Sequence, residues 1–281
     1  MMININYHEI TKRTLAATSE DFVAGAISLD NFIIVVDSTL FPHTGKLFRD
    51  QIEKRFKMPV KFLFITHYHG DHLWGIGAFS DVSIVGSVLL IENSEKERPI
   101  QPAKFKEWEK KDPEKANLIK EINTSFHPQI TFTNGMRIHD GDLFVELRHC
   151  GGHTSCSSYA YYPQEKVLFV GDLIFAKQWP WAGDQTCDPD RWINGLEEIM
   201  KLDIETVIPG HGPIVMKEEI EIYLNFLRDL REETIITLEK SDGIEQIKIP
   251  PFYEDNTPES WVKKETLNFF YGFYKNKMMQ Y

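Results

Sequence analysis

Short apolar runs separated by polar residues fill the first third of the chain. Residues 22–37 hold two apolar, β-rich runs around a central Asp-Asn pair, which predicts a hairpin. Residues 44–56 carry phenylalanine or isoleucine at regular helical spacing and predict an amphipathic helix. The almost continuously apolar residues 60–66 are typical of a strand buried on both faces. Residues 73–80 and 82–85 predict a short helix and another strand.

The region between residues 130 and 170 returns to a strand-like pattern. Apolar runs predict strands at residues 130–133, 136–139, 143–150, 158–162 and 166–170. The dipeptides Asn134-Gly135 and Asp140-Gly141 are strong turn signals, so we expect them to separate neighbouring strands.

Helical patterns follow toward the C-terminal end. Residues 189–202, with an early proline, predict a helix, and residues 205–208 predict a strand. Residues 217–238 predict a longer helix. Thr257 and Pro258 have the pattern of an N-cap followed by proline at the first helical position, and they open a helical tail rich in aromatic residues. This tail could cap the domain or pack in a homodimer.

Residues 91–125 differ from the rest in composition. They contain 16 charged residues in 35, eight of each sign, and three prolines. Balanced charge argues against an arm that binds nucleic acid. We expect solvated helices there, which form either a lid over a site or a simple surface insertion.

Composition limits the class of protein. The 281 residues are 42% hydrophobic and 26% charged, as in ordinary globular chains, which excludes disorder, collagen or coiled coil for the whole chain. The length allows one large domain or two small ones. With 31 basic and 42 acidic residues the net charge is −11, which disfavours nucleic acid as a partner.

Cysteine usage and hydropathy bear on the compartment. The three cysteines (Cys150, Cys156 and Cys187) are too few and too irregularly spaced for a disulfide framework, which indicates a reducing compartment. The N-terminal residues lack the apolar core of a signal peptide. No stretch approaches the roughly 20 apolar residues of a membrane span. We therefore expect a cytoplasmic protein with no membrane partner.

The densest group of metal-binding residue types follows the predicted strand 60–66. His67, His69, Asp71 and His72 fall within six residues of one another. On a helix, residues two apart would point in different directions. In a loop, His67 and His69 can turn to one ion while Asp71 and His72 turn to a second. Gly70 permits the tight backbone path.

Three further ligand-type residues each follow an apolar run beside a glycine. His153 lies in GGHT, Asp172 in GD and His211 in PGHG. Because sites of α/β proteins assemble at the ends of strands, we expect these residues to meet the first group. Five of the ten histidines occupy these motifs.

This ordered set of motifs resembles that of the metallo-β-lactamase fold superfamily, in particular its hydrolase members such as glyoxalase II. The resemblance implies a four-layer αββα sandwich of two mixed β-sheets with a short C-terminal helical extension. Residues 1–215 would form this domain, with the charged insertion at about 91–125. Residues 216–281 would form a helical segment that packs on the same domain.

The resemblance also implies roles for the motif residues. One metal ion would be held by His67, His69 and His153, a second by Asp71, His72 and His211, and Asp172 would bridge the two. This set of imidazoles and carboxylates suits zinc, although iron or manganese also fit such ligands. No cysteine fits a ligand position. Asp37 and Thr66, at strand ends, are candidates to brace a metal-bound histidine.

The implied function is a dinuclear hydrolase that uses a metal-bound hydroxide on an ester, thioester or lactone. Asp71 and Asp172 are the candidate catalytic residues, which would orient the nucleophile or relay its proton. The substrate would be a small molecule, and Tyr68, Trp74 and the Trp179-Pro180-Trp181 segment are candidates to line its pocket. The alternatives are an iron-dependent persulfide dioxygenase-like oxidoreductase and a phosphodiesterase or ribonuclease-like member.

Overall fold

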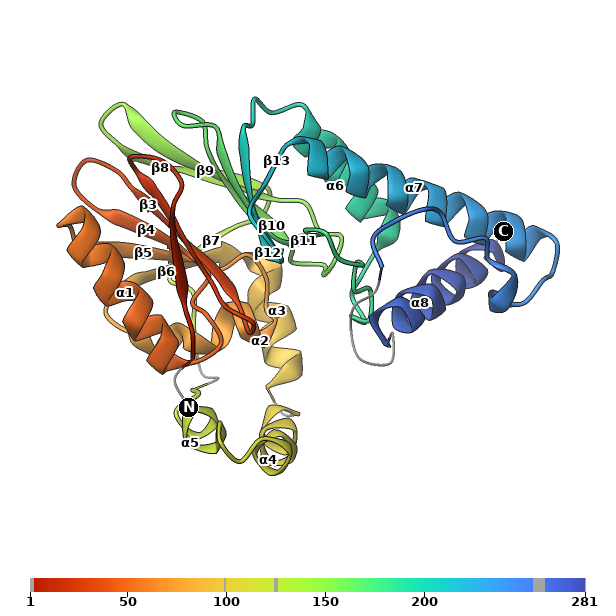
Figure 1. Ribbon diagram of the computed structural model, residues 1–281, viewed down its shortest axis with the longest axis horizontal. Coiled ribbons are helices and arrows are strands. Elements are labelled where there is room, and N and C mark those ends of the chain that lie inside the picture. The colour runs from red at the N-terminus through yellow and green to blue at the C-terminus, as the bar shows by residue number, and fades with distance from the viewer. Residues whose placement is uncertain (1–2, 99, 124–125, 255–260, 281) are drawn as a thin grey trace.

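The computed structural model describes residues 3–98, 100–123, 126–254 and 261–280. These residues form two β-sheets that pack face to face, with helices on their outer sides (Figure 1). The predicted N-cap at Thr257 and Pro258 lies outside the described residues.

The first sheet contains seven strands in chain order. Its strands are β1 (Asn6–Glu9), β2 (Thr14–Thr18), β3 (Val23–Ser28), β4 (Ile33–Val36), β5 (Val60–Phe64), β6 (Ser83–Ser87) and β7 (Ile130–Phe132). Neighbours from β1 to β4 run antiparallel, and those from β4 to β7 run parallel. The predicted hairpin is confirmed as β3 and β4, in which Ile27 faces Ile34.

The second sheet has the order β13-β12-β11-β10-β9-β8. Its strands are β8 (Gly135–Asp140), β9 (Leu143–His149), β10 (Ser158–Tyr162), β11 (Val167–Phe175), β12 (Thr206–His211) and β13 (Val215–Met216). Only β11 and β12 pair in parallel. The turn at Gly141, with φ of +62°, closes the β8–β9 hairpin as predicted. The other turn signal behaves differently, because Asn134-Gly135 carries the chain from one sheet to the other.

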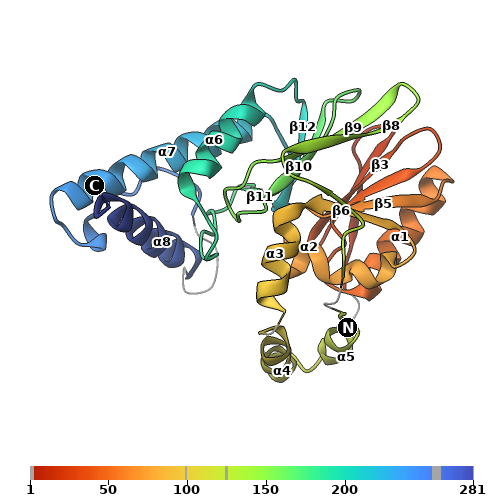
Figure 2. The ribbon, with the colours of Figure 1, turned by 180° about the vertical axis from the view of Figure 1, so that it is seen from behind.

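Helices occupy the remaining segments. They are α1 (Pro42–Phe56), α2 (Gly70–Leu73), α3 (Val88–Glu97), α4 (Gln101–Lys111), α5 (Ala116–Lys120), α6 (Pro189–Met200), α7 (Glu218–Glu239) and α8 (Trp261–Met278), with short 3₁₀ segments η1 (Trp74–Phe79) and η2 (Ile244–Gln246). Helices predicted in the charged segment 91–125 are confirmed in its described part by the end of α3 and by α4 and α5, which project from the sheets (Figure 2).

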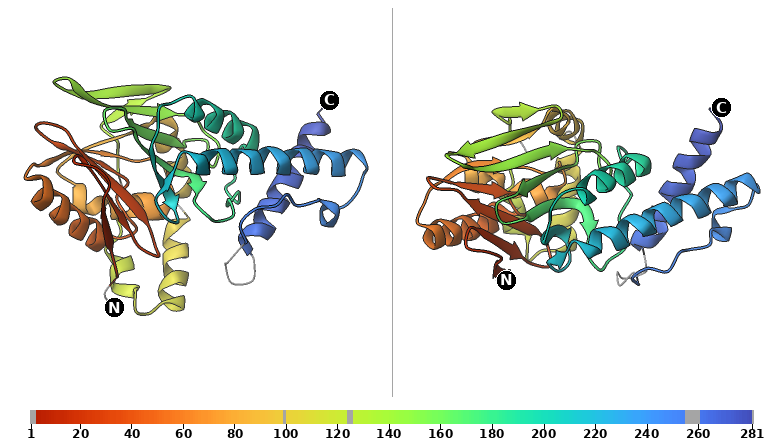
Figure 3. Two further views of the ribbon diagram at one scale, coloured as in Figure 1. Left: turned by 45° about the horizontal axis from the view of Figure 1, so that its top comes forward. Right: turned by 90° about the horizontal axis from the view of Figure 1, so that it is seen from above.

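Alternation along the strands explains the four layers. In β4, Ile33 and Val35 pack in the apolar cluster that contains Phe48 of α1, whereas Ile34 and Val36 face the space between the sheets. All four residues are buried, as expected for strands covered on both faces. The second sheet is covered on its outer face by α6 and α7, and Figure 3 shows the resulting order of helix, sheet, sheet and helix. The predicted αββα architecture is therefore confirmed.

The C-terminal helices join the outer apolar layer of the second sheet. Tyr223 and Leu227 of α7 and Phe270 of α8 belong to the same buried cluster as Trp192 of α6. Glu219 at the start of α7 is also buried, and its carboxylate accepts hydrogen bonds from the Lys177 backbone at 3.0 Å and from the Lys177 ammonium at 2.6 Å. None of the described helices is long and apolar enough to cross a bilayer.

Candidate metal centre

The first histidine motif lies at the end of β5 and runs into a single helical turn. His67 follows the strand, and His69 has an extended backbone as the residue before α2. Asp71 and His72 lie inside α2, so the expectation of a loop across the whole motif is wrong. This turn points Asp71 and His72 to a different place from the two preceding histidines. The separation of the motif into two pairs, predicted for a loop, is thus achieved by an extended segment followed by a helical turn.

The other three residues come from the second sheet. His153 lies in the connection between β9 and β10, and His211 is the last residue of β12. Asp172 lies within β11, at an irregularity in its pairing with β12. Two glycines allow the close packing around Asp172. A Cβ at Gly210 would lie 1.9 Å from Asp172 Oδ1, and one at Gly171, where φ is +52°, would lie 2.6 Å from Thr66 Oγ1. The glycines that precede Asp172 and His211 therefore have a steric reason.

The seven side chains meet in two groups that share one residue. Cluster 1 consists of His67, His69, His153 and Asp172. Cluster 2 consists of Asp71, His72, Asp172 and His211. In each cluster one potential ligand atom per residue lies within 4.8 Å of all the others. None of the three cysteines belongs to either group, as the sequence indicated.

Nitrogen atoms converge closely in cluster 1. His69 Nδ1 lies 3.0 Å from His67 Nε2 and 3.0 Å from His153 Nε2. Asp172 Oδ2 lies 3.3 Å from His153 Nε2 and 3.6 Å from His67 Nε2. Ligands held at about 2.0–2.1 Å from one zinc ion lie roughly 3.0–3.4 Å apart, so the spacing fits a shared ion.

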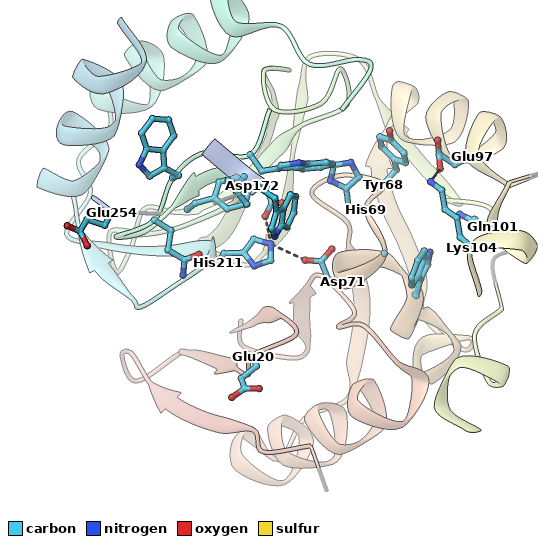
Figure 4. Close-up of a pocket in the computed structure, with 18 residues that line it drawn as sticks. Glu20, Tyr68, His69, Asp71, Glu97, Gln101, Lys104, Asp172, His211 and Glu254 are labelled. Carbon is cyan, nitrogen blue, oxygen red and sulfur yellow. Dashed lines mark hydrogen bonds and ion pairs between the residues drawn. The ribbon is translucent and has the colours of Figure 1, made fainter. Parts of the chain in front are cut away.

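Cluster 2 has the same spacing with the other oxygen of Asp172. His72 Nε2 lies 3.0 Å from Asp172 Oδ1 and 3.2 Å from Asp71 Oδ2. His211 Nε2 lies 3.0 Å from Asp71 Oδ2 and 3.4 Å from Asp172 Oδ1 (Figure 4). Asp172 thus directs one carboxylate oxygen into each cluster.

Hydrogen bonds outside the clusters fix the tautomers of the histidines. His72 Nδ1 donates to Asp37 Oδ2 at 2.8 Å, and His153 Nδ1 donates to the carbonyl oxygen of Trp181 at 3.0 Å. His69 Nε2 donates to Asp184 Oδ2 at 2.9 Å. In the neutral form of each ring these nitrogens carry the proton, so that the other nitrogen can present a lone pair to a cluster.

His67 is held by a relay of two hydrogen bonds. The Thr66 hydroxyl donates to Asp37 Oδ2 at 2.9 Å, so it accepts the proton of His67 Nδ1 at 3.1 Å. The Thr66 backbone N–H also donates to Asp37 Oδ1, at 2.8 Å. Asp37 and Thr66 therefore brace the motif histidines, as predicted from their places at strand ends.

Unpartnered polar atoms mark the centre of the arrangement. His72 Nε2 and Asp172 Oδ1 are buried and have no hydrogen-bond partner, although they lie 3.0 Å apart. A buried polar atom without a partner is costly, and a metal ion would satisfy both atoms at once. The donor set, its spacing and these two atoms together fit a pair of divalent ions.

Protonation states differ between the clusters. Burial lowers the pKa of His67 to about 4 and holds that of His153 well below its usual value, so both rings are neutral. Burial opposes protonation of His72 as well, but the carboxylates of Asp71, Asp172 and Asp37 outweigh it and raise its pKa. Neutral imidazoles are the form that binds metal, so cluster 1 is ready to bind and cluster 2 must first lose protons.

A pocket of about 720 Å³ opens over both clusters. It is lined by Asp71, Asp172 and His211 at its base and by Tyr68, Trp74, Trp179 and Trp181, which confirms the aromatic residues predicted to line it. The charged helical segment contributes Glu97, Gln101 and Lys104, and helix α8 contributes Trp261 and Val262. Segments far apart in the sequence thus enclose one space.

Three contributions to the site carry no signal in the sequence. Asp184 is 5% exposed and accepts hydrogen bonds from His69 and from the Tyr68 hydroxyl, but it lies in a loop without a recognisable motif. The ring of Phe175 stacks on His211, with centroids 5.1 Å apart. Trp261 reaches the pocket only through the packing of the tail. Each of these depends on tertiary contacts between segments that are distant in sequence.

The sequence of this chain was compared with family models and with known proteins. A family model described as the Metallo-beta-lactamase superfamily matches residues 24–211. The linear primary-alkylsulfatase of Pseudomonas sp. (strain ATCC 19151) is 22% identical over 284 residues, which cover 88% of this chain and 52% of that protein. The metallo-beta-lactamase type 2 of Bacillus cereus is 24% identical over 188 residues, 65% of this chain and 63% of that protein.

A further curated relative and a solved structure are also similar to this chain. The hydroxyacylglutathione hydrolase of Bartonella henselae is 23% identical over 155 residues, 55% of this chain and 49% of that protein. The chain thus spans only about half to three-fifths of the length of these curated relatives. A metallo-beta-lactamase structure from Pontibacter korlensis superposes with a TM-score of 0.62 and 21% identity, and covers 80% of this chain and 99% of that one. At this identity the structural likeness shows the shared fold.

Proposed function

Because the chain belongs to the metallo-beta-lactamase superfamily, we propose that it is a hydrolase that binds two divalent metal ions and cleaves an ester, thioester or lactone. One observation carries the proposal: Asp172 directs Oδ2 toward the nitrogens of cluster 1 and Oδ1 toward cluster 2. A carboxylate placed in this way is suited to bridging two ions.

When bound, two such ions would activate a water molecule as a nucleophile and polarise the bond under attack. The protein side chains would orient the histidine ligands and the attacking water. Asp37, Asp184 and the Trp181 carbonyl keep the N–H groups of the histidines pointing away from the clusters. Asp71, which is partly exposed and lines the pocket, can accept a proton at its carboxylate or orient the attacking water.

We propose zinc as the resident metal. Five imidazoles and two carboxylates without a thiolate suit zinc, although the same ligands also bind iron or manganese. An iron-dependent oxidoreductase acting on a persulfide uses similar ligands and remains the main alternative. A phosphodiesterase or ribonuclease-like activity is disfavoured because the net charge of −11 repels polyanions.

One of the relatives suggests a second candidate substrate class. The protein similar over 88% of the chain is a linear primary-alkylsulfatase. An alkyl sulfate is also cleaved by hydrolysis, and aromatic residues in the pocket would accommodate its alkyl chain. We therefore include sulfate esters beside carboxylic esters, thioesters and lactones as substrates to test.

The test combines metal analysis with a substrate screen. Purified protein is expected to contain about two zinc ions per chain, as a dinuclear site requires, and to hydrolyse at least one of these ester classes. One iron per chain, with oxygen uptake on a persulfide and no hydrolysis, would show the proposed function to be wrong.

A further inference from the structure

We propose that the pocket selects substrates whose non-reacting part is apolar and carries no negative charge. This inference rests on the proposed hydrolase function and narrows it. It follows from two properties of the residues that line the pocket, the large aromatic surface and the sign of the charges around it.

Six aromatic side chains line the wall of the pocket beyond the metal clusters. They are Tyr68, Trp74, Phe175, Trp179, Trp181 and Trp261. A cavity of about 720 Å³ with walls of this kind is large enough for a drug-sized apolar group. Burying an apolar substituent against such rings would contribute to affinity without any charge on the substrate.

Helix α8 holds part of this wall in place. The Trp181 indole N–H donates to Glu265 Oε2 at 2.6 Å, and Trp261 and Val262 of the same helix line the pocket directly. Trp179, which is 4% exposed, packs with its ring 5.0 Å from that of Phe226 in α7. The aromatic surface is therefore fixed before a substrate arrives, which reduces the entropy lost on binding.

The charges outside the metal clusters are mainly negative. Glu20, Glu97 and Glu254 line the pocket, and Figure 4 shows them spread around the central group of His69, Asp71, Asp172 and His211. Among the described lining residues there is no arginine, and the one lysine is Lys104. A second anionic group on the substrate, away from the reacting bond, would meet carboxylates rather than a free cation.

Lys104 is already engaged by a carboxylate of the same pocket. Its ammonium lies 2.8 Å from Glu97 Oε2, a contact visible in Figure 4. The ion pair of Lys104 and Glu97 has no net charge. Outside the metal clusters, Glu20 and Glu254 therefore give the described wall of the pocket a net negative charge. Two bound metal ions would act most strongly on the reacting group, which lies closest to them, and their attraction falls with distance toward the carboxylates of the wall.

A matched pair of substrates tests the inference. Phenyl esters of hexanoic acid and of adipic acid have the same reacting bond and chain length, but the adipoyl ester ends in a carboxylate. With the zinc-loaded enzyme we expect kcat/KM to be at least tenfold higher for the hexanoyl ester. Decyl sulfate and its ω-carboxylated counterpart give the same comparison for the sulfate class. An equal or higher kcat/KM for the carboxylated partner would overturn the inference while leaving the hydrolase function intact.

Binding gives a reading that does not depend on turnover. Tryptophan fluorescence can follow binding of N,N-dimethylnaphthalene-2-sulfonamide and of naphthalene-2-sulfonate, which share one apolar body and differ in charge. We expect the neutral compound to bind at least tenfold more tightly. If the neutral compound binds more tightly but none of the esters is hydrolysed, the pocket inference is supported and the hydrolase function is refuted. Tighter binding of the sulfonate would overturn the pocket inference.

A pair of variants tests the role of Lys104. Glu97→Gln releases Lys104, so kcat/KM for the adipoyl ester should rise about three- to fivefold relative to the hexanoyl ester. Glu107→Gln is the matched control, because it also removes one negative charge, in this case from α4. It breaks an ion pair with Lys111 that likewise measures 2.8 Å but lies outside the pocket. If the ratio of kcat/KM for the adipoyl ester to that for the hexanoyl ester is the same in the two variants, Lys104 and Glu97 do not discriminate between substrates.

Discussion

His153 donates its Nδ1 proton to the backbone carbonyl of Trp181 at 3.0 Å, which connects a residue of cluster 1 to the wall of the pocket. The same segment is supported by helix α8, since the Thr266 hydroxyl donates to the Pro180 carbonyl at 2.5 Å and accepts from the Ala182 backbone N–H at 3.2 Å. The C-terminal helix therefore supports a metal-binding residue through two successive contacts.

The first prediction concerns Thr266. Thr266→Val keeps the shape of this fully buried side chain but removes both hydrogen bonds to the segment 180–182. His153 should then be held less firmly, and the affinity of cluster 1 for zinc should fall about 10-fold in competition with a chelator. Thr234→Val is the control, because Thr234 is equally buried but bonds only within α7, to Leu230. Unchanged zinc affinity in Thr266→Val would argue against support through α8.

Asp37 gives a second prediction, for cluster 2. Its carboxylate accepts protons from His72 Nδ1 and from both the N–H and the hydroxyl of Thr66. Asp37→Asn replaces one acceptor oxygen by a donor, so His72 loses the partner that fixes its tautomer. Since asparagine tolerates the φ of +63° at this position, the backbone should be unaffected. We expect zinc affinity to fall about 10- to 100-fold, and a change of less than twofold would show that Asp37 does not orient His72.

Proton release on metal binding is the third prediction. Burial opposes protonation of His211, but the carboxylates of Asp172 and Asp71 raise its pKa to about 10. This raised pKa stabilises the metal-free fold below the usual histidine pKa of about 6.5, and the contribution is lost as the pH rises through about 10. Zinc must displace that proton, so its apparent affinity should increase with pH up to about 10. Calorimetry in buffers of different ionisation enthalpy measures the protons released, and a pH-independent affinity would contradict this account.

Much of the fold follows from the sequence because its strands are short, apolar and separated by clear turns. The strands missed are β1, β2 and β13: Asn6–Glu9 is mostly exposed and polar, and Val215–Met216 has only two residues. The turn at Asn134-Gly135 joins two sheets rather than two paired strands, a difference that depends on tertiary packing and not on local propensity.

The candidate site was predictable to a similar extent. The seven clustered residues lie in short glycine-containing motifs that follow apolar, strand-like runs, so their motifs reveal them. Asp184 and Trp261 do not, because the first is positioned by a loop and the second by the docking of α8. Whether residues 91–125 cover the site was open from the sequence, and the positions of Glu97 and Lys104 place this segment at the pocket wall.

The fourth prediction concerns the shared carboxylate. Asp172→Ala removes a side chain that contacts both clusters, so the zinc content should fall below two ions per chain and turnover should fall by orders of magnitude. Asp188→Ala, which removes the N-cap of α6 on the same side of the fold, controls for general destabilisation. Wild-type zinc content and turnover in Asp172→Ala would refute the shared role of this residue.

Anomalous diffraction from zinc-loaded crystals at the zinc absorption edge tests the central claim most directly. We predict two peaks per chain, one among His67, His69 and His153 and the other among Asp71, His72 and His211, with Asp172 contacting both. A single peak in cluster 1, or peaks at neither cluster, would contradict a dinuclear centre.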